Sequence, residues 1–271
     1  MEGILLVDGE ENAIFCHDAS RIGQNIATIK KGLESGWKPT SEVAELLISD
    51  GDQVDCIKTM HQAGCPITDE MVKMAAMHGR INCLQYFVSV GYQMNESIAI
   101  LAAMTGQLDC LEYLTEIGAC PENICGLAAA TNQLECLEWL YNKGFKLYDT
   151  AASAATYGSV ECLIFALNAC GGEVEIDIEK MIMNGHLECT KIIHEIGGLS
   201  DSDADLAIIY DQMEIFEYLK SEGYKWSKHL IDSDGNRSWI AMKLTKEYTA
   251  TRRAKERELK GSIHNNSLSC E

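Results

Sequence analysis

The chain has 271 residues, of which 46% are hydrophobic, and its formal net charge is −19. This hydrophobic content excludes general disorder, and the presence of only three prolines disfavours a loop-rich β protein. The acidic excess disfavours nonspecific binding to nucleic acid or to anionic membranes. We therefore expect neither as a partner.

The charge is unevenly distributed along the chain. Residues 1–236 hold 14 basic and 37 acidic side chains, whereas residues 237–271 hold 8 basic and 4 acidic ones. The body is thus strongly acidic and the tail mildly basic. An acidic body favours a protein partner that carries a basic patch, because complementary charge speeds association.

The N-terminal sequence MEGILLVDGEENAIF contains no basic region, and its apolar run is only four residues long. This pattern is not that of a secretory signal. No part of the sequence approaches the 18 consecutive apolar residues of a membrane-spanning helix. We therefore expect a reducing location, the cytoplasm, where the 12 cysteines remain thiols.

A repeated phrase organises most of the chain. GRINCLQYFVSVG, GQLDCLEYLTEIG and NQLECLEWLYNKG begin at residues 79, 106 and 132, and each has a cysteine in the same slot. Chance would not maintain spacings of 26 and 27 residues over seven copies. The slot is occupied by Cys56, Cys83, Cys110, Cys136, Cys162, Cys189 and Ile215.

Each repeat predicts two short helices. Alanine pairs such as Ala102-Ala103 precede the cysteine and allow close helix packing. Four residues before the cysteine stands a glycine, Asn or Asp, which are the residues that tolerate a left-handed helix stop. The second helix of the clearest copy runs from about Leu108 to Ile117, with apolar residues at three-residue steps, and a second glycine ends it.

A short segment links each repeat to the next one. It ends in a residue suited to cap the following helix, namely Thr40, Thr68, Asn95, Asp149 and Ser227. Helices of about ten residues are marginal alone and must bury their apolar faces against neighbours. We therefore predict an all-α helical-hairpin solenoid with 26–27-residue repeats over residues 41–227.

The two ends of the chain differ from the repeats between them. Residues 20–40 look like a worn repeat, so residues 1–40 are predicted to form an N-terminal cap repeat. SWIAMKL, at residues 238–244, is apolar enough to cover the last repeat, which predicts a C-terminal cap over residues 228–245. The remaining residues, 246–271, are a charged tail that is predicted to be helical or disordered.

The phrase AAMTGQLDCLEYLTEIGACPE (residues 102–122) resembles the ankyrin repeat, and more closely the divergent short ankyrin repeats of large DNA viruses of amoebae and of some protists. The resemblance covers about residues 40–226. The chain departs from ordinary ankyrin repeats in its period, which is 26–27 rather than 33, and in lacking their threonine-proline-leucine-histidine opening. The resemblance implies an ankyrin-like fold with a shortened finger between repeats.

No motif for catalysis, for a cofactor or for a metal ion stands out. Cys120 and Cys125 form a C-x4-C pair, but no second ligand pair accompanies them, whereas zinc needs four convergent ligands. The sequence contains no phosphate-binding loop, dinucleotide fingerprint, nucleophile elbow or zinc-protease motif. We therefore expect a noncatalytic protein without cofactor, metal or small-molecule substrate.

The loops after the second helices hold the candidate binding residues. Apolar side chains stand one and three residues after the helix-ending glycine, and this alternation predicts a short extended segment. They either pack over the neighbouring loop and close one edge of the core, or line a groove for a partner. The partner-binding candidates are Trp37, Tyr92, Met94, Phe145, Lys146, Tyr148, Tyr224 and Trp226.

The function that these observations predict is that of a protein–protein interaction scaffold with an ankyrin-type repeat surface. Its loops and first helices would hold one or more protein partners, and a stiff surface loses little entropy on binding. The alternative is a structural or assembly component, of a virus particle if the viral resemblance holds. The location would then be the host cytoplasm. An enzyme or metal protein is the third class.

Overall fold

The computed structural model describes residues 4–7, 13–16, 22–171, 174–227 and 240. The chain divides into two compact bodies, Met1–Ala154 and Ala155–Glu271, which we call the N-terminal body and the C-terminal body. The division falls inside helix α10 (Thr150–Tyr157).

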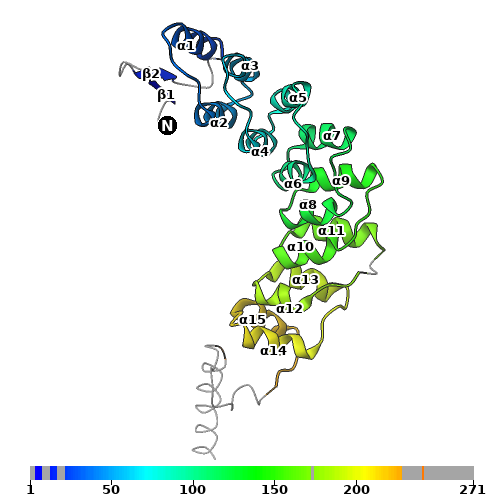
Figure 1. Ribbon diagram of the computed structural model, residues 1–271. Coiled ribbons are helices and arrows are strands. Elements are labelled where there is room, and N and C mark those ends of the chain that lie inside the picture. Colours follow the sequence, from blue (N-terminus) through cyan, green and yellow to red (C-terminus); the bar gives the residue numbers. More distant parts are fainter. Residues whose placement is uncertain (1–3, 8–12, 17–21, 172–173, 228–239, 241–271) are drawn as a thin grey trace, which may run out of the picture. The chain divides into compact units, whose positions relative to one another are not determined.

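Two rows of helices build the N-terminal body (Figure 1). The first helices of successive repeats pack side by side, and so do the second helices. The row of first helices contains α2 (Ser41–Asp50), α4 (Asp69–Met77), α6 (Glu96–Met104) and α8 (Ile124–Ala130). The row of second helices contains α1 (Ile22–Glu34), α3 (Val54–Gln62), α5 (Ile81–Ser89), α7 (Leu108–Glu116) and α9 (Leu134–Asn142).

The C-terminal body repeats this arrangement. Its first helices α12 (Ile178–Met183) and α14 (Asp201–Ile209) pack against each other. Its second helices α11 (Val160–Ala169), α13 (Leu187–Glu195) and α15 (Met213–Ser221) form the other row. The predicted fold class, stacked helical hairpins with a 26–27-residue repeat, is confirmed in both bodies.

A β-hairpin precedes the helices and was not predicted. Strand β1 (Ile4–Val7) pairs antiparallel with β2 (Ala13–Cys16), so that Ile4 faces Cys16 and Val7 faces Ala13. β1 lies beside α2 and β2 beside α1. Runs of four apolar residues are too short for their periodicity to separate a strand from a helix. Within the predicted N-terminal cap, α1 takes the place of the second helix of a repeat, because it packs on α3.

The core consists of a few slots that every repeat fills in the same way. Both alanines of each pair are fully buried, as in Ala102-Ala103 of α6. In each second helix from α3 to α15 the buried positions include the cysteine slot, the residue directly after it and the residue four positions after the slot; in α7 these are Cys110, Leu111 and Leu114. Ile117 was predicted to extend this face, but it is 42% exposed because it follows the last turn of α7.

Left-handed residues end the helices where the sequence predicted them. Gly79, Gly106, Gly158 and Gly185 have φ between 70° and 78°, and Asn132 and Asp211 have 57° and 56°. Asp52 was predicted to share this conformation and does not. Its carboxylate instead accepts hydrogen bonds from the backbone and side-chain amides of Asn82, at 3.3 and 2.6 Å.

A ladder of polar side chains crosses the turns between the two helices of each repeat. In four repeats the residue that precedes the second helix places its side chain over the left-handed glycine of the preceding repeat; these residues are Gln107, Gln133, His186 and Gln212. A Cβ atom on Gly106 would lie well inside van der Waals contact with Gln133 Oε1, and one on Gly185 would collide with Gln212. Gln133 Nε2 in turn donates to the Thr131 carbonyl, at 3.1 Å. A side chain at this glycine would therefore have to adopt a φ that favours glycine and would also have to displace the glutamine above it.

Substitution of Gly106 tests the ladder. Gly106→Ala and Gly118→Ala both place a side chain at similar φ, 73° and 77°, which costs about 1–2 kcal/mol of folding free energy. Nothing lies within 4 Å of a Cβ on Gly118. We therefore expect urea unfolding to show a larger loss for Gly106→Ala, and the excess to disappear when Gln133→Ala is added. Equal losses for the two single variants would contradict the ladder.

The repeated cysteines form a buried column of free thiols within each body. These cysteines are all 0% exposed, namely Cys56, Cys83, Cys110, Cys136, Cys162 and Cys189. The ten cysteines in the described part of residues 22–227 are all free thiols. Burial, helped by the charge of Asp109, raises the pKa of the Cys110 thiol to about 12. A protonated, enclosed thiol is a poor nucleophile. The column is thus a structural filler in the core, as predicted from its slot.

Thiol labelling checks this column. When the native chain is treated with a maleimide at neutral pH and mapped by mass spectrometry, we expect Cys120 and Cys170, which are partly exposed, to react well before Cys83, Cys110 and Cys136. In urea all should react alike. Rapid native labelling of Cys110 would contradict the packing described here.

The predicted C-terminal cap (228–245) and tail (246–271) lie outside the described residues, apart from Ile240. That residue is 0% exposed, and its backbone N–H donates to Asp211 Oδ1 at 3.2 Å. Of the predicted helix caps, Thr68 and Asn95 accept hydrogen bonds from the backbones of Met71 and Ser97, whereas the side chain of Thr40 makes no such cap bond.

Candidate protein-binding surface

The loops that follow the second helices hold all eight predicted binding residues, and their side chains differ in exposure. Trp37 is buried at 7% exposure, whereas Tyr148 is exposed at 55%. Lys146 is also exposed. The half-buried members are Tyr92, Met94, Phe145, Tyr224 and Trp226.

The slot directly after the helix-ending glycine closes the edge of the core. Trp37, Cys65 and Ala119 occupy it in three repeats and are buried. The intervening residues Lys38 and Pro66 are exposed, so the loops alternate as the sequence predicted. The sequence left open whether these loop residues close the edge of the core or line a groove for a partner. Trp37 closes the edge of the core.

Tyr92 is held by the preceding repeat. Its hydroxyl donates to Asp69 Oδ1, the first residue of α4, at 2.7 Å. Burial, together with this hydrogen bond, raises the pKa of Tyr92 to about 12. The bond ties two neighbouring loops together, and Tyr92 is therefore engaged within the fold.

Tyr224 and Trp226 pack within the C-terminal body. The Tyr224 ring meets the His194 ring edge-on, with centroids 5.5 Å apart, and the Trp226 ring lies 5.3 Å from that of Phe216. His194 Nδ1 is also 2.6 Å from the hydroxyl of Tyr218. Edge-to-face pairs of this kind add stability beyond buried area.

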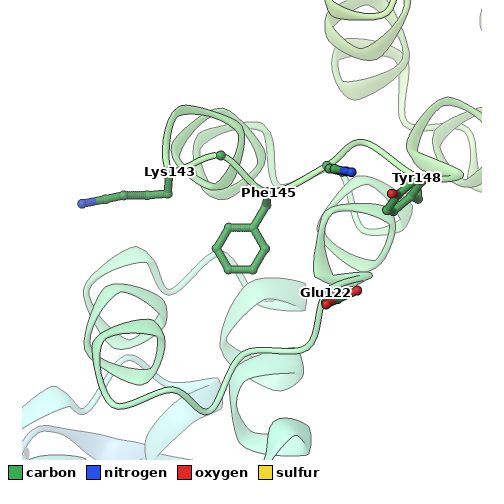
Figure 2. Close-up of a pocket in the computed structure, with 6 residues that line it drawn as sticks. Glu122, Lys143, Phe145 and Tyr148 are labelled. Atoms are coloured by element: carbon green, nitrogen blue, oxygen red, sulfur yellow. The ribbon is translucent and has the colours of Figure 1, made fainter.

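Phe145, Lys146 and Tyr148 come together in one pocket of the N-terminal body. The pocket has a volume of ≈ 320 Å³ and is also lined by Glu122, Lys143 and Gly144. We call these six residues the Phe145 pocket. Figure 2 shows the ring of Phe145 directed toward the loop that carries Glu122, with Tyr148 on one side and Lys143 extending on the other.

The end of α9 positions this pocket. Gly144 has φ 92°, and the Phe145 N–H donates to the Leu140 carbonyl at 3.0 Å, which turns the chain sharply after the helix. Asp149, at φ 51°, precedes α10 in a left-handed conformation. The corresponding residues Thr68, Asn95 and Ser200 are extended. The loop of this repeat thus has its own backbone path, and Tyr148 is exposed on it.

Both lysines of the pocket rest on aromatic rings. Lys143 Nζ lies 5.2 Å from the ring centroid of Trp139, and Lys146 Nζ lies 5.5 Å from that of Tyr148. A hydrogen bond to Tyr148 is the main reason why the pKa of Lys146 lies above its ordinary value, and the charge of Glu122 adds to the effect. Lys146 is therefore fully charged at neutral pH.

Sequence reasoning did not single out Glu122 and Lys143 as members of the site. Glu122 lies in the loop before α8, one repeat earlier, and only the stacking of repeats brings it to the pocket. Lys143 had one sequence signal: after Arg80, it and Lys146 are the first basic residues to occur. Trp37, Tyr92 and Met94 belong to other loops and do not line this pocket.

Across the part of the chain that the structure describes, no three His, Cys, Asp or Glu side chains are placed to hold a metal ion. Within the same described residues, every helix is too short or too polar to cross a membrane. The Phe145 pocket offers two ammonium groups, one carboxylate, one phenol and one phenyl ring. Such a set can recognise a side chain by charge and by apolar contact.

The stacked hairpins define a helical repeat protein. More specifically, residues 72–151 match the family model of ankyrin repeats, in three copies. No curated protein sequence matches the chain. In a comparison with solved structures, the crystal structure of the human ASB11 ankyrin repeat domain is 19% identical, with a TM-score of 0.45, over 56% of this chain and 83% of that one.

Two substitutions separate the structural from the exposed members of the predicted set. Trp37→Ala removes a buried ring and should cost about 3–5 kcal/mol of folding free energy in urea unfolding. Tyr148→Ala removes an exposed ring and should change it by less than about 0.5 kcal/mol. A severe loss for Tyr148→Ala would show that its side chain supports the fold.

Proposed function

We propose that this chain is a noncatalytic protein-binding scaffold of the ankyrin-repeat kind that acts in the cytoplasm. The observation that carries the proposal is the match of residues 72–151 to ankyrin repeats, which generally mediate protein–protein interaction. The Phe145 pocket lies within the matched residues and presents aromatic and charged groups on its surface. We infer one or more proteins as partners, rather than nucleic acid, a membrane or a small-molecule substrate.

The rigidity of the loops around the Phe145 pocket supports a role in binding. The loops around the pocket are anchored by helix-ending glycines, by backbone bonds such as that from Phe145 to Leu140, and by the buried column below them. A surface that is already ordered loses little conformational entropy when a partner arrives. Exposed aromatic side chains such as Tyr148 are effective interface anchors.

The charge of the scaffold indicates the kind of partner. Residues 1–236 hold 37 acidic against 14 basic side chains. A protein with a basic patch would be steered toward this surface, and its association would slow as salt is added. The acidic surface disfavours nucleic acid for the same electrostatic reason.

A capture experiment tests the proposal. The full chain, immobilised, should recover a protein from lysate of its source cells, and the purified protein should bind the chain in solution. Tyr148→Ala should weaken that binding, whereas Tyr157→Ala, which removes an equally exposed tyrosine outside the predicted set, should not. Failure of every recovered protein to bind in solution would count against the scaffold role. Recovery of the chain in particles at fixed stoichiometry would favour the assembly role instead.

A further inference from the structure

The Phe145 pocket concentrates positive charge in an acidic part of the fold. From residue 81 to the end of the N-terminal body at residue 154, Lys143 and Lys146 are the only basic residues, against eight Asp and Glu, and there is no histidine. Both lysines line the pocket. An anionic group near this part of the body is therefore attracted at the pocket and repelled by the surrounding carboxylates.

Lys146 and Tyr148 together offer two hydrogen-bond donors. Lys146 Nζ lies 5.5 Å from the ring centroid of Tyr148, and an ammonium group donates hydrogen bonds but cannot accept one from the phenol. The phenolic proton thus remains to be donated to a ligand. Lys143 extends on the opposite side of the Phe145 ring, toward Trp139, and so contributes by its charge at longer range (Figure 2).

Phe145 provides the apolar part of the pocket. Its backbone N–H is bound to Leu140, and its half-buried ring is directed into the pocket (Figure 2). The exposed part of this ring can cover an apolar side chain next to the anionic group. A ring held in place by backbone bonds gives such contact at low entropic cost.

We propose that the Phe145 pocket binds a segment of the protein partner in which an acidic side chain lies beside an apolar one. The carboxylate accepts hydrogen bonds from Lys146 and Tyr148, and the apolar side chain lies against Phe145. This inference rests on the proposed function and deepens it. The partner carries a basic patch for the acidic surface and one acidic–apolar pair that sets its register.

The charge of the pocket favours a carboxylate over a phosphate. Lys143, Lys146 and Glu122 together carry one net positive charge, which a single carboxylate neutralises. A phosphorylated side chain carries about 1.5–2 negative charges at neutral pH, which would leave negative charge in excess beside Glu122. Glu122 thus selects against the more highly charged anion.

Peptide selection tests this inference. A displayed library of random peptides is selected on the full wild-type chain and counter-selected on Lys146→Glu. We expect the enriched peptides to contain Asp or Glu adjacent to an apolar residue. Enrichment of peptides without an acidic residue, or failure to enrich any peptide that depends on Lys146, would overturn the proposal.

The affinities of one enriched peptide, measured by fluorescence anisotropy, give the contribution of each residue. Lys146→Ala should weaken binding about threefold and Lys143→Ala less, while Glu122→Gln should strengthen it about twofold. Lys38→Ala is the matched control, since Lys38 is exposed in the same repeat slot but does not line the pocket. Equal effects of Lys38→Ala and Lys146→Ala would show only a general change in charge, and would overturn the proposal.

Variants of the peptide identify the anion. Replacing its acidic residue by the neutral amide should weaken binding to the wild-type chain, and so should replacing it by phosphoserine. Tighter binding of the phosphoserine peptide would overturn the choice of a carboxylate. All protein variants are exposed-site changes, and unchanged circular dichroism confirms their folding.

The two proposals can fail separately. If the captured partner binds the chain and Lys146→Glu leaves its affinity unchanged, the scaffold role stands and the pocket inference falls. If no protein is captured but acidic–apolar peptides bind in a Lys146-dependent way, the pocket chemistry stands and the scaffold role loses its support.

Discussion

The structure depends on the burial of apolar helix faces between repeats. Helices such as α5 and α7 are nine residues long, a length at which an isolated helix is marginal in water. Each becomes stable only when its cysteine, the next apolar residue and the one four later meet the helices on either side. The side chains in these slots range in size from Ala166 to Phe87, but they are buried in the helices of both bodies, so the same arrangement recurs.

That constraint also explains the turns. Two helices fit into 26 or 27 residues only if each ends abruptly, and the left-handed glycines provide those ends. At the turns that contain Gly79, Gly106, Gly158 and Gly185, the neighbouring repeat then covers the glycine with Gln107, Gln133, His186 and Gln212, respectively. A polar side chain thus links neighbouring repeats at the surface while the cysteine column links them in the core. The loops between repeats are held separately, by the glycines that end the second helices and by contacts such as the hydrogen bond from Tyr92 to Asp69.

Because the loops between repeats are fixed at their ends, their side chains can differ from one repeat to the next without disturbing the fold. The slot after the helix-ending glycine contains buried Trp37, Cys65 and Ala119 in some repeats and the half-buried Phe145 in another. The repeat with Phe145 also has Lys146, Tyr148 and the left-handed Asp149. Variation confined to the loops, over an unvarying core, is how a repeat fold acquires a specific binding surface.

The repeat spacing in the sequence determined the helical hairpins, the left-handed stops and the buried cysteines, because these follow from local periodicity and from residue chemistry that every copy shares. The tertiary structure decided the features that depend on contacts between repeats. Asp52 binds Asn82 instead of forming a left-handed stop, and Trp37 is buried at the edge of the core. Glu122 lines the same pocket as Lys143 and Lys146. The pairing of β1 with β2 likewise could not be predicted, since a run of four apolar residues is too short for its periodicity to separate a strand from a helix.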